Sequence, residues 1–340
     1  MNNYIDTEKS EIYHNEAVIN NFSVIVTERC NLKCSYCHFY KTVSRDSIRD
    51  MSKELLEQYM HFLKYFTNTV GGEKTIRFSG GDPIVLGDNL FDMADIAYKI
   101  SGLEPYFLTA GKGINEKWIE KARRSAFTHA FISLENPINP DSGSVNPYET
   151  IKKVKELSTP EFILDFGVTV VSNEHFKNIY KICKIVFEET GKLPKIQEIN
   201  YLPYESPTDE QLNQLYENLV SVISEFHSKA SMDFFSYISP EFSAAHNKKE
   251  SYLTELNINN HHNIGEIEWA KSLKSILERQ HMNYPESDCT NNKCDWFNEC
   301  KRIKWLWKKP SANVSAEQKF ADYCRFKKTI NSAFYDALNN

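Results

Sequence analysis

Short β-rich runs alternate with helical stretches along residues 22–205 of this 340-residue chain. Each strand and its helix take about thirty residues, the length of a βαβ unit, so we expect parallel strands joined by right-handed crossovers. This pattern predicts an α/β fold, a partial (β/α)6 barrel of the TIM type, with functional groups at the carboxyl ends of the strands. The predicted strands are Phe22–Val26, Lys74–Phe78, Pro105–Leu108, Ala130–Leu134, Ile163–Val171 and Lys195–Leu202.

The intervening helices follow from apolar residues at helical spacing. A further helix is predicted over Asp209–Lys229, where the preceding Thr208 supplies an N-cap. Its apolar stripe consists of Leu212, Leu215, Leu219, Val222, Ile223 and Phe226. The helices of the barrel are predicted at Lys53–Phe66, Asn89–Lys99, Glu116–Arg124, Pro147–Leu157 and His175–Glu189.

Three cysteines, Cys30, Cys34 and Cys37, directly follow the first predicted strand. Three thiolates on one short loop hold three irons of a 4Fe-4S cluster and leave the fourth iron without a protein ligand. The alternative is a zinc site, in which the adjacent His38 would join the three thiolates. An open iron offers a place for chemistry, whereas such a zinc site would be structural.

The second predicted strand runs into the sequence Gly80-Gly81-Asp82-Pro83. Glycines allow the backbone to approach a ligand closely, because no Cβ stands in the way. Taken alone, the sequence would be an ordinary turn. Its place at a strand end, downstream of the cysteines, makes it a second candidate binding element.

Together these two motifs resemble those of the radical S-adenosylmethionine (SAM) enzymes. The resemblance implies that SAM chelates the open iron and is cleaved to a 5'-deoxyadenosyl radical. It also implies that Tyr36 lies near the adenine and that Gly80, Gly81 and Asp82 contact SAM, Asp82 replacing the commoner Glu. The implied cofactors are a SAM-binding 4Fe-4S cluster and SAM, with a flavodoxin- or ferredoxin-type electron donor as partner.

Two later strand ends resemble elements of the same family. Thr109-Ala110-Gly111 is similar to a Thr-Asn-Gly turn, with Ala110 in place of Asn, and Ser133 begins a segment similar to Ser-Leu-Asp-Gly-Pro. The resemblance implies that Thr109 and Ser133 bind SAM. The alternative is that both are strand-end hydroxyls satisfied within the protein. Candidates for a base or hydrogen donor, among which the sequence does not choose, are Glu135, Glu198, Tyr201 and Tyr204.

Four further cysteines gather near the C-terminus, and four thiolates suit either a fully ligated 4Fe-4S cluster or a structural zinc. Their wide spacing favours the cluster, because zinc sites prefer pairs separated by two to four residues. The region resembles a shortened SPASM extension of peptide maturases, which implies a second, auxiliary 4Fe-4S cluster. Arg325 departs from that pattern. The four candidate ligands are Cys289, Cys294, Cys300 and Cys324.

Composition limits the classes of function. A formal charge of -6 gives no electrostatic footprint for nucleic acid. The N-terminus is acidic without a long apolar run, so we expect no membrane segment and a cytoplasmic protein. Eight cysteines in such a chain indicate metal ligation rather than disulfides. Cys183 is the exception, because it lies on an apolar helix face and is predicted to be a buried hydrophobe.

Three functional hypotheses follow. The first is a radical SAM enzyme that abstracts hydrogen from a ribosomally synthesised peptide to install a crosslink, thioether or epimerised residue, with a separate leader-binding protein as a further partner. The second keeps the radical chemistry on a small molecule such as an amino sugar or amino acid. The third is a non-enzymatic zinc scaffold. The expected organisation is an N-terminal extension over 1–21, a radical SAM barrel over 22–207, a helical bridge over 208–288 and an irregular cluster domain over 289–340.

Overall fold

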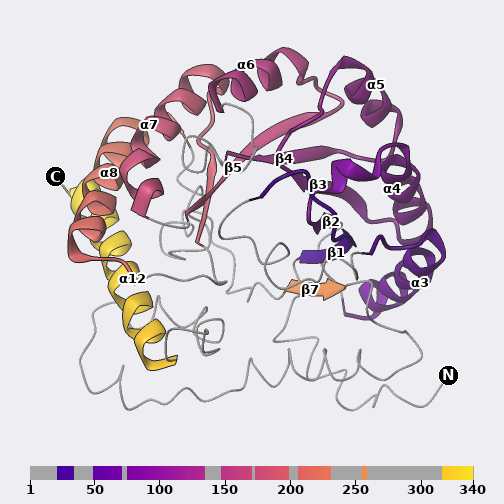
Figure 1. Cartoon of the computed structure of the whole chain (residues 1–340), viewed down its shortest axis with the longest axis horizontal. Coiled ribbons are helices and arrows are strands. Elements are labelled where there is room, and N and C mark those ends of the chain that lie inside the picture. Colours follow the sequence, from indigo (N-terminus) through magenta and orange to yellow (C-terminus); the bar gives the residue numbers. More distant parts are fainter. Residues whose placement is uncertain are drawn as a thin grey trace.

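The chain is described from a computed structural model. The described residues are 21–33, 49–70, 75–134, 147–170, 173–198, 206–230, 255–258 and 316–339. Within these ranges strands and helices alternate along the chain as predicted, and the helices form an arc around the strands (Figure 1).

The strands form one seven-stranded sheet in the order β6-β5-β4-β3-β2-β1-β7. Every neighbouring pair is parallel. Because β1 to β6 are neighbours in chain order, each helix crosses back on the same side, as in a barrel wound in one direction. The α/β class and the partial parallel barrel are therefore confirmed. The strands are β1 (Asn21–Thr27), β2 (Thr75–Gly80), β3 (Glu104–Thr109), β4 (His129–Ser133), β5 (Ile163–Val170), β6 (Lys195–Glu198) and β7 (Glu255–Ile258).

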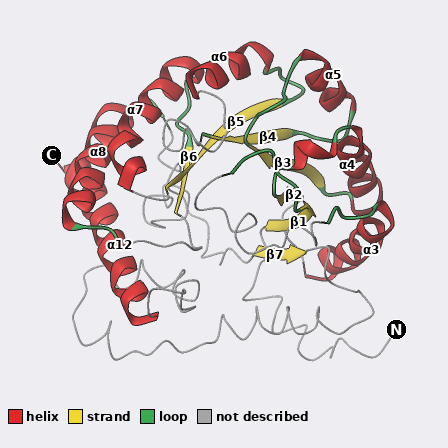
Figure 2. Ribbon diagram, in the orientation of Figure 1, coloured by secondary structure: helices red, strands yellow, loops and turns green. Residues whose placement is uncertain are grey.

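The helices cover the outer face of the sheet (Figure 2). Of the six predicted helices, two have the expected bounds, and the others begin or end within a few residues of the expected positions. A short 3-10 helix, η2 (Pro83–Leu86), follows β2. The α-helices are α3 (Lys53–Val70), α4 (Asp88–Ser101), α5 (Glu116–Arg124), α6 (Pro147–Leu157), α7 (Asn173–Thr190), α8 (Asp209–Phe226) and α12 (Ala316–Asn339).

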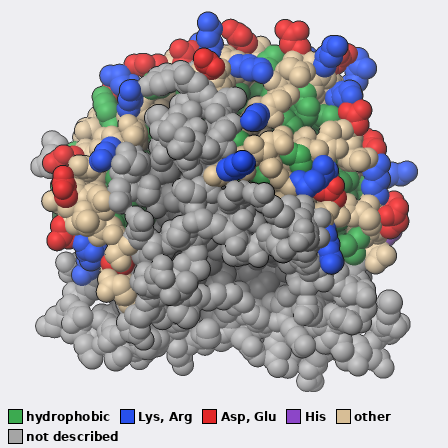
Figure 3. Space-filling model, in the orientation of Figure 1, with side chains coloured by type: hydrophobic (Ala, Val, Ile, Leu, Met, Phe, Trp, Pro, Cys, Tyr) green, Lys and Arg blue, Asp and Glu red, His purple; other side chains and the backbone are tan. Residues whose placement is uncertain are grey.

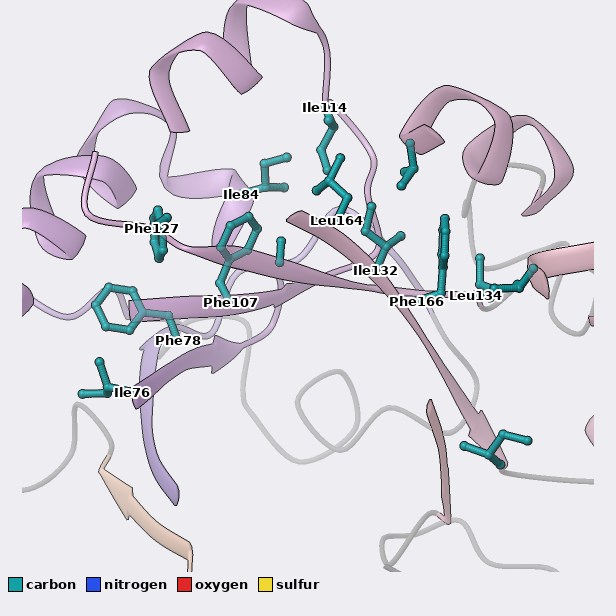
Figure 4. Packing of buried hydrophobic residues seen from close by; sticks show 14 of the residues in the cluster. Ile76, Phe78, Ile84, Phe107, Ile114, Phe127, Ile132, Leu134, Leu164 and Phe166 are labelled. Atoms are coloured by element: carbon teal, nitrogen blue, oxygen red, sulfur yellow. The ribbon is translucent and has the colours of Figure 1, made fainter. Parts of the chain in front are cut away.

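The core lies between the sheet and this helical layer. Strand residues alternate between buried and half-buried positions in β2 and β4, which is the pattern of a strand with one face against helices. Phe78, Phe107 and Phe127 lie together there (Figure 4). The ring centroids of Phe107 and Phe127 are 4.9 Å apart, within the range of favourable aromatic contacts. Cys183 is fully buried in this core, as predicted.

Helix α8 has the capping and packing that its sequence predicts. The Thr208 hydroxyl accepts a hydrogen bond from the Gln211 N–H, and the Gln211 side chain accepts one from the Thr208 N–H. All six apolar residues of the predicted stripe are buried. The helix packs against α7, the preceding helix of the barrel. The boundary between barrel and bridge near residue 208 stays a prediction.

Strand β7 is the main departure from the predicted architecture. The sequence predicts six strands, and the sheet has a seventh within the stretch expected to be helical. Its four residues, Glu255 to Ile258, pair with Asn21 to Val24 of β1. Such a short run has little β-pattern of its own, and it becomes a strand because the edge of β1 offers unpaired backbone groups.

Helix α12 lies within the segment expected to be irregular, and it packs along α8. The rings of Phe176 and Phe326 stack with centroids 6.0 Å apart. The Tyr216 hydroxyl donates to Asp336 over 2.5 Å. Arg325 forms an ion pair with Asp209, so the residue that departs from the SPASM pattern fastens this helix to the barrel.

The outer surface carries charges of both signs. Blue and red side chains intermingle over the described part of the face in Figure 3. Among the helices that the structure describes, none has the length and apolar character needed to span a membrane.

Candidate functional site at the carboxyl ends of the strands

The cysteine segment leaves the barrel at the carboxyl end of β1. Cys30 is exposed, three residues after the strand ends, and its Sγ accepts a hydrogen bond from the Leu32 N–H over 3.3 Å. Backbone N–H groups directed at sulfur are one of the means by which proteins tune iron–sulfur clusters. An accessible thiol with such a donor therefore suits a cluster ligand. Cys34, Tyr36 and Cys37 lie outside the described residues.

The segment between residues 30 and 48 begins and ends at one backbone junction. The Glu28 N–H donates to the Arg49 carbonyl over 3.0 Å, and the Met51 N–H donates to the Val26 carbonyl over 2.9 Å. Thr27 and Asp50 form an antiparallel β-bridge there. Both ends of the cysteine segment are thus held at the top of β1.

Gly80 and Gly81 press against the same junction. A Cβ on Gly80 would lie 2.0 Å from the Thr27 carbonyl oxygen, and a Cβ on Gly81 would lie 2.2 Å from the Arg29 carbonyl oxygen. The N–H groups of Gly81 and Asp82 donate to these two carbonyls, each over 2.8 Å. The space on the Cβ side of each glycine is therefore filled by the protein's own backbone. The predicted contact of the glycines with SAM stays a prediction.

Asp82 is buried and joins the ends of β2 and β3. Its carboxylate accepts hydrogen bonds from the Ile84 N–H over 3.4 Å and from the Ala110 N–H over 3.3 Å. Burial raises the pKa of Asp82, although hydrogen bonds from Thr109, Ala110 and Ile84 oppose the rise. The Asp82 side chain thus binds protein groups, and its contact with Ala110 needs no asparagine at that position.

The raised pKa of Asp82 predicts a pH-dependent stability. Because the folded state binds the proton more tightly than the unfolded chain, stability falls as pH rises from the ordinary aspartate range to the folded-state pKa. In Asp82→Asn that fall should disappear, while the lost acceptor lowers stability by about 1 kcal/mol at every pH. Urea unfolding of both proteins between about pH 4 and pH 7 would measure this. Parallel stability curves would contradict the prediction.

Thr109 and Ser133 differ in what their hydroxyls contact. Thr109 is buried, bonds the Asp82 carboxylate and accepts the Gly111 N–H over 3.1 Å. This favours the alternative in which Thr109 is satisfied within the protein. Ser133 is half-buried at the end of β4, and its hydroxyl has no hydrogen-bond partner within the described ranges. The assignment of Ser133 to SAM therefore stays a prediction.

Only one member of the second cysteine group is described. Cys324 is half-buried on α12, whereas Cys289, Cys294 and Cys300 lie outside the described residues. In the part of the chain that the structure covers, no three metal-ligating side chains come together. Of the candidate bases, Glu198 ends β6, and Glu135, Tyr201 and Tyr204 lie outside the described residues.

Sequence reasoning missed Arg29 and Asp50 as residues of this site. They flank the cysteine segment and bind one another at the junction. The sequence signal for this pair is a positive residue before the cysteine segment and a negative residue after it. Charges on predicted loops are so common that this signal becomes specific only when the two ends are seen side by side.

The fold is a partial parallel barrel. At the carboxyl ends of its strands, backbone hydrogen bonds join the start of the cysteine segment to the glycine turn. Residues 24–183 match the sequence model of the Radical SAM superfamily. This matched stretch, a little under half of the chain, is therefore similar to a radical SAM domain.

Curated relatives match mainly through this domain. A probable GTP 3',8-cyclase of Methanocaldococcus jannaschii is 24% identical over 220 residues, covering 62% of this chain and 67% of the relative. A pyruvate formate-lyase-activating enzyme of Clostridium pasteurianum is 32% identical over 92 residues, covering 27% of this chain and 37% of that protein. A probable GTP 3',8-cyclase of Archaeoglobus fulgidus is matched over 36% of its length. Apart from the first of these three, the chain spans little more than a third of each relative.

Solved structures match over more of the chain. Native anSMEcpe with bound AdoMet has a TM-score of 0.63 at 16% identity, covering 94% of this chain and 99% of that one. Streptococcus suis SuiB has a TM-score of 0.50 at 15% identity, covering 74% of this chain and 62% of that one. At these identities the likeness establishes the fold.

Proposed function

We propose that this protein is a radical SAM enzyme whose SAM site lies at the carboxyl ends of β1, β2 and β4. The observation that carries the proposal is the junction that joins the cysteine segment to the Gly-Gly-Asp-Pro turn. Cys30, Cys34 and Cys37 would hold a 4Fe-4S cluster. When bound, that cluster supplies the electron that splits SAM into methionine and a 5'-deoxyadenosyl radical.

The chain's own groups position SAM. Because the N–H groups of Gly81 and Asp82 already donate to the β1 end, the turn offers a ligand carbonyl oxygens. The amino group of SAM is a hydrogen-bond donor, so we assign it to the carbonyls of Gly80 and Gly81. Ser133 supplies a hydroxyl from β4, and Tyr36 is assigned to the adenine on the family resemblance.

Ser133→Ala is expected to weaken SAM binding. Loss of one neutral hydrogen bond, worth about 0.5–1.5 kcal/mol, should raise the SAM Kd about twofold to thirteenfold. Anaerobic calorimetry would measure the Kd, and the midpoint of thermal unfolding should not change. Ser221→Ala, on the exposed side of α8, is the matched control. An unchanged Kd in Ser133→Ala would remove this residue from the site.

We propose that the substrate is a peptide, because the cysteine pattern near the C-terminus resembles that of SPASM peptide maturases. One of the solved structures similar to this chain is anSMEcpe with bound AdoMet and Kp18Cys peptide. The radical would remove hydrogen from an unactivated C–H bond of a ribosomally made peptide. A second 4Fe-4S cluster on Cys289, Cys294, Cys300 and Cys324 would accept the electron left by a net oxidation, and a flavodoxin- or ferredoxin-type protein would supply the first electron.

A small-molecule substrate is the second candidate. The curated relatives favour it, because the names GTP 3',8-cyclase and probable GTP 3',8-cyclase recur among them. That observation concerns the barrel, which the relatives share, whereas the C-terminal cysteines motivate the peptide. The two proposals therefore rest on different parts of the chain.

Formation of 5'-deoxyadenosine separates these candidates. Reconstituted protein would be assayed anaerobically with a short peptide encoded beside its gene and with a panel containing GTP, amino acids and amino sugars. Stimulation by the peptide alone supports the first proposal, and stimulation by a panel member supports the second. Two cubane clusters would bring about eight irons per chain with matching sulfide. Zinc without sulfide would support a scaffold and contradict both.

A further inference from the structure

We propose that Arg29 and Asp50 act as a positioning pair, which holds the cysteine segment in register with the Gly-Gly-Asp-Pro turn. This inference rests on the proposed function, because positioning the cysteine segment matters only if that segment binds the cluster. Neither residue is assigned a contact with SAM or iron. Their effect passes through the backbone junction at the top of β1.

The pair has the geometry of a two-pronged clamp. Arg29 Nε donates to Asp50 Oδ1 over 2.9 Å, and Arg29 Nη2 donates to Asp50 Oδ2 over 2.6 Å. Such a bidentate contact fixes orientation as well as distance. The Thr27 hydroxyl adds a third donor to Asp50 Oδ1 over 2.6 Å, and it also accepts the Arg29 N–H over 3.0 Å. Residues before and after the cysteine segment are thereby tied together.

Two of these residues, Thr27 and Arg29, also contact the glycine turn. The Thr27 and Arg29 carbonyls accept the N–H groups of Gly81 and Asp82. A shift of Arg29 therefore moves the hydrogen-bond acceptor of Asp82. The clamp on one side and the turn on the other share one short backbone segment, so the position of Cys30 is linked to the position of the turn.

The solvent exposure of the Arg29 and Asp50 side chains indicates that the pair contributes little to the stability of the whole domain. The side chains of Arg29 and Asp50 are 48% and 38% exposed, and exposed ion pairs contribute little to the stability of a whole domain. Partial burial alone would raise the pKa of Asp50, but the hydrogen bonds from Arg29 and Thr27 lower it, so the carboxylate is ionised at neutral pH. We therefore expect a local effect of the pair on the junction without a change in global unfolding.

Amide hydrogen exchange on metal-free protein tests the clamp directly. In Arg29→Gln and in Asp50→Asn, the amides of Glu28, Met51 and Asp82 should exchange about two- to fivefold faster than in the wild type. The double variant should match the single variants, because either change removes the same interaction. Arg29→Lys, which keeps the charge and loses the fork, should be intermediate. Unchanged exchange at these amides would overturn the proposal.

The second measurement is SAM binding to protein that has been reconstituted with iron and sulfide. Both neutral variants should weaken SAM binding to the same degree, with an unchanged thermal midpoint. The control is Glu189→Gln, which breaks a comparably exposed ion pair of 3.0 Å with Lys155 and should change neither quantity. If Arg29→Gln weakened SAM binding and Asp50→Asn did not, Arg29 would act on the ligand and the proposal would be wrong.

The two measurements also distinguish this proposal from the proposed function. Wild-type protein that binds neither iron nor SAM would remove the radical SAM function. Faster exchange in the metal-free variants would still establish the clamp.

Discussion

Cys30→Ala is expected to abolish SAM cleavage while the fold is preserved. Removing one of the three thiolates that we propose as cluster ligands would leave one iron of the cluster without its ligand. Because Cys30 is exposed, its loss should change the free energy of unfolding of the metal-free protein by less than about 0.5 kcal/mol. Iron and sulfide content, 5'-deoxyadenosine formation and urea unfolding would be measured on the same preparations.

Cys183 is the matched control for this experiment, because its environment is the opposite. It is fully buried, and burial raises the pKa of its thiol, which disfavours the thiolate that metals bind. Cys183→Ala should keep the iron and cleave SAM, and it should destabilise the fold by about 1 kcal/mol. Cleavage of SAM by Cys30→Ala would refute the assignment of the cluster. Equivalent results for Cys34→Ala and Cys37→Ala are expected from the family resemblance.

Gly81→Ala should be strongly destabilising. The new Cβ would lie 2.2 Å from the Arg29 carbonyl oxygen and 2.6 Å from the Arg29 carbonyl carbon, and these backbone atoms move only if the junction opens. The overpacking and the two lost hydrogen bonds together should cost about 3 kcal/mol. Urea unfolding would give this loss, and the iron content after reconstitution should fall with it.

Gly102→Ala provides the comparison for that substitution. Gly102 ends α4 with φ 74, and no atom lies within 4 Å of the Cβ that alanine would add. The left-handed backbone should cost about 1 kcal/mol without disturbing the cluster. If Gly81→Ala and Gly102→Ala were equally stable and bound equal amounts of iron, the close packing at the junction would have no functional meaning.

Much of the barrel could be predicted because its signals are local. The helices Glu116–Arg124 and Pro147–Leu157 have the bounds that their apolar spacing predicts. The buried stripe and the capping of α8 follow from residues within one helix. Strand β7 could not be predicted, because its formation depends on the free edge of β1, more than two hundred residues earlier in the chain.

The structure shows which protein groups surround the residues of the predicted site. Spacing within the chain pointed to Cys30 and to the glycine turn. The expected neighbour of the glycines was a ligand, whereas the structure places the Thr27 and Arg29 backbone there. Thr109 and Asp82 were expected to face SAM, and their side chains bond each other and the strand ends.

By itself, the order of residues determined the kind of elements, their alternation and the chemical types available at the strand ends, because these depend on neighbours within about one helical turn or one strand. Only the tertiary structure decided which groups are already satisfied. Asp82 and Thr109 bond each other, and Arg29 bonds Asp50. The physical reason is that a buried polar group takes whatever partner the packed strands bring near, and that partner belongs to a different part of the chain.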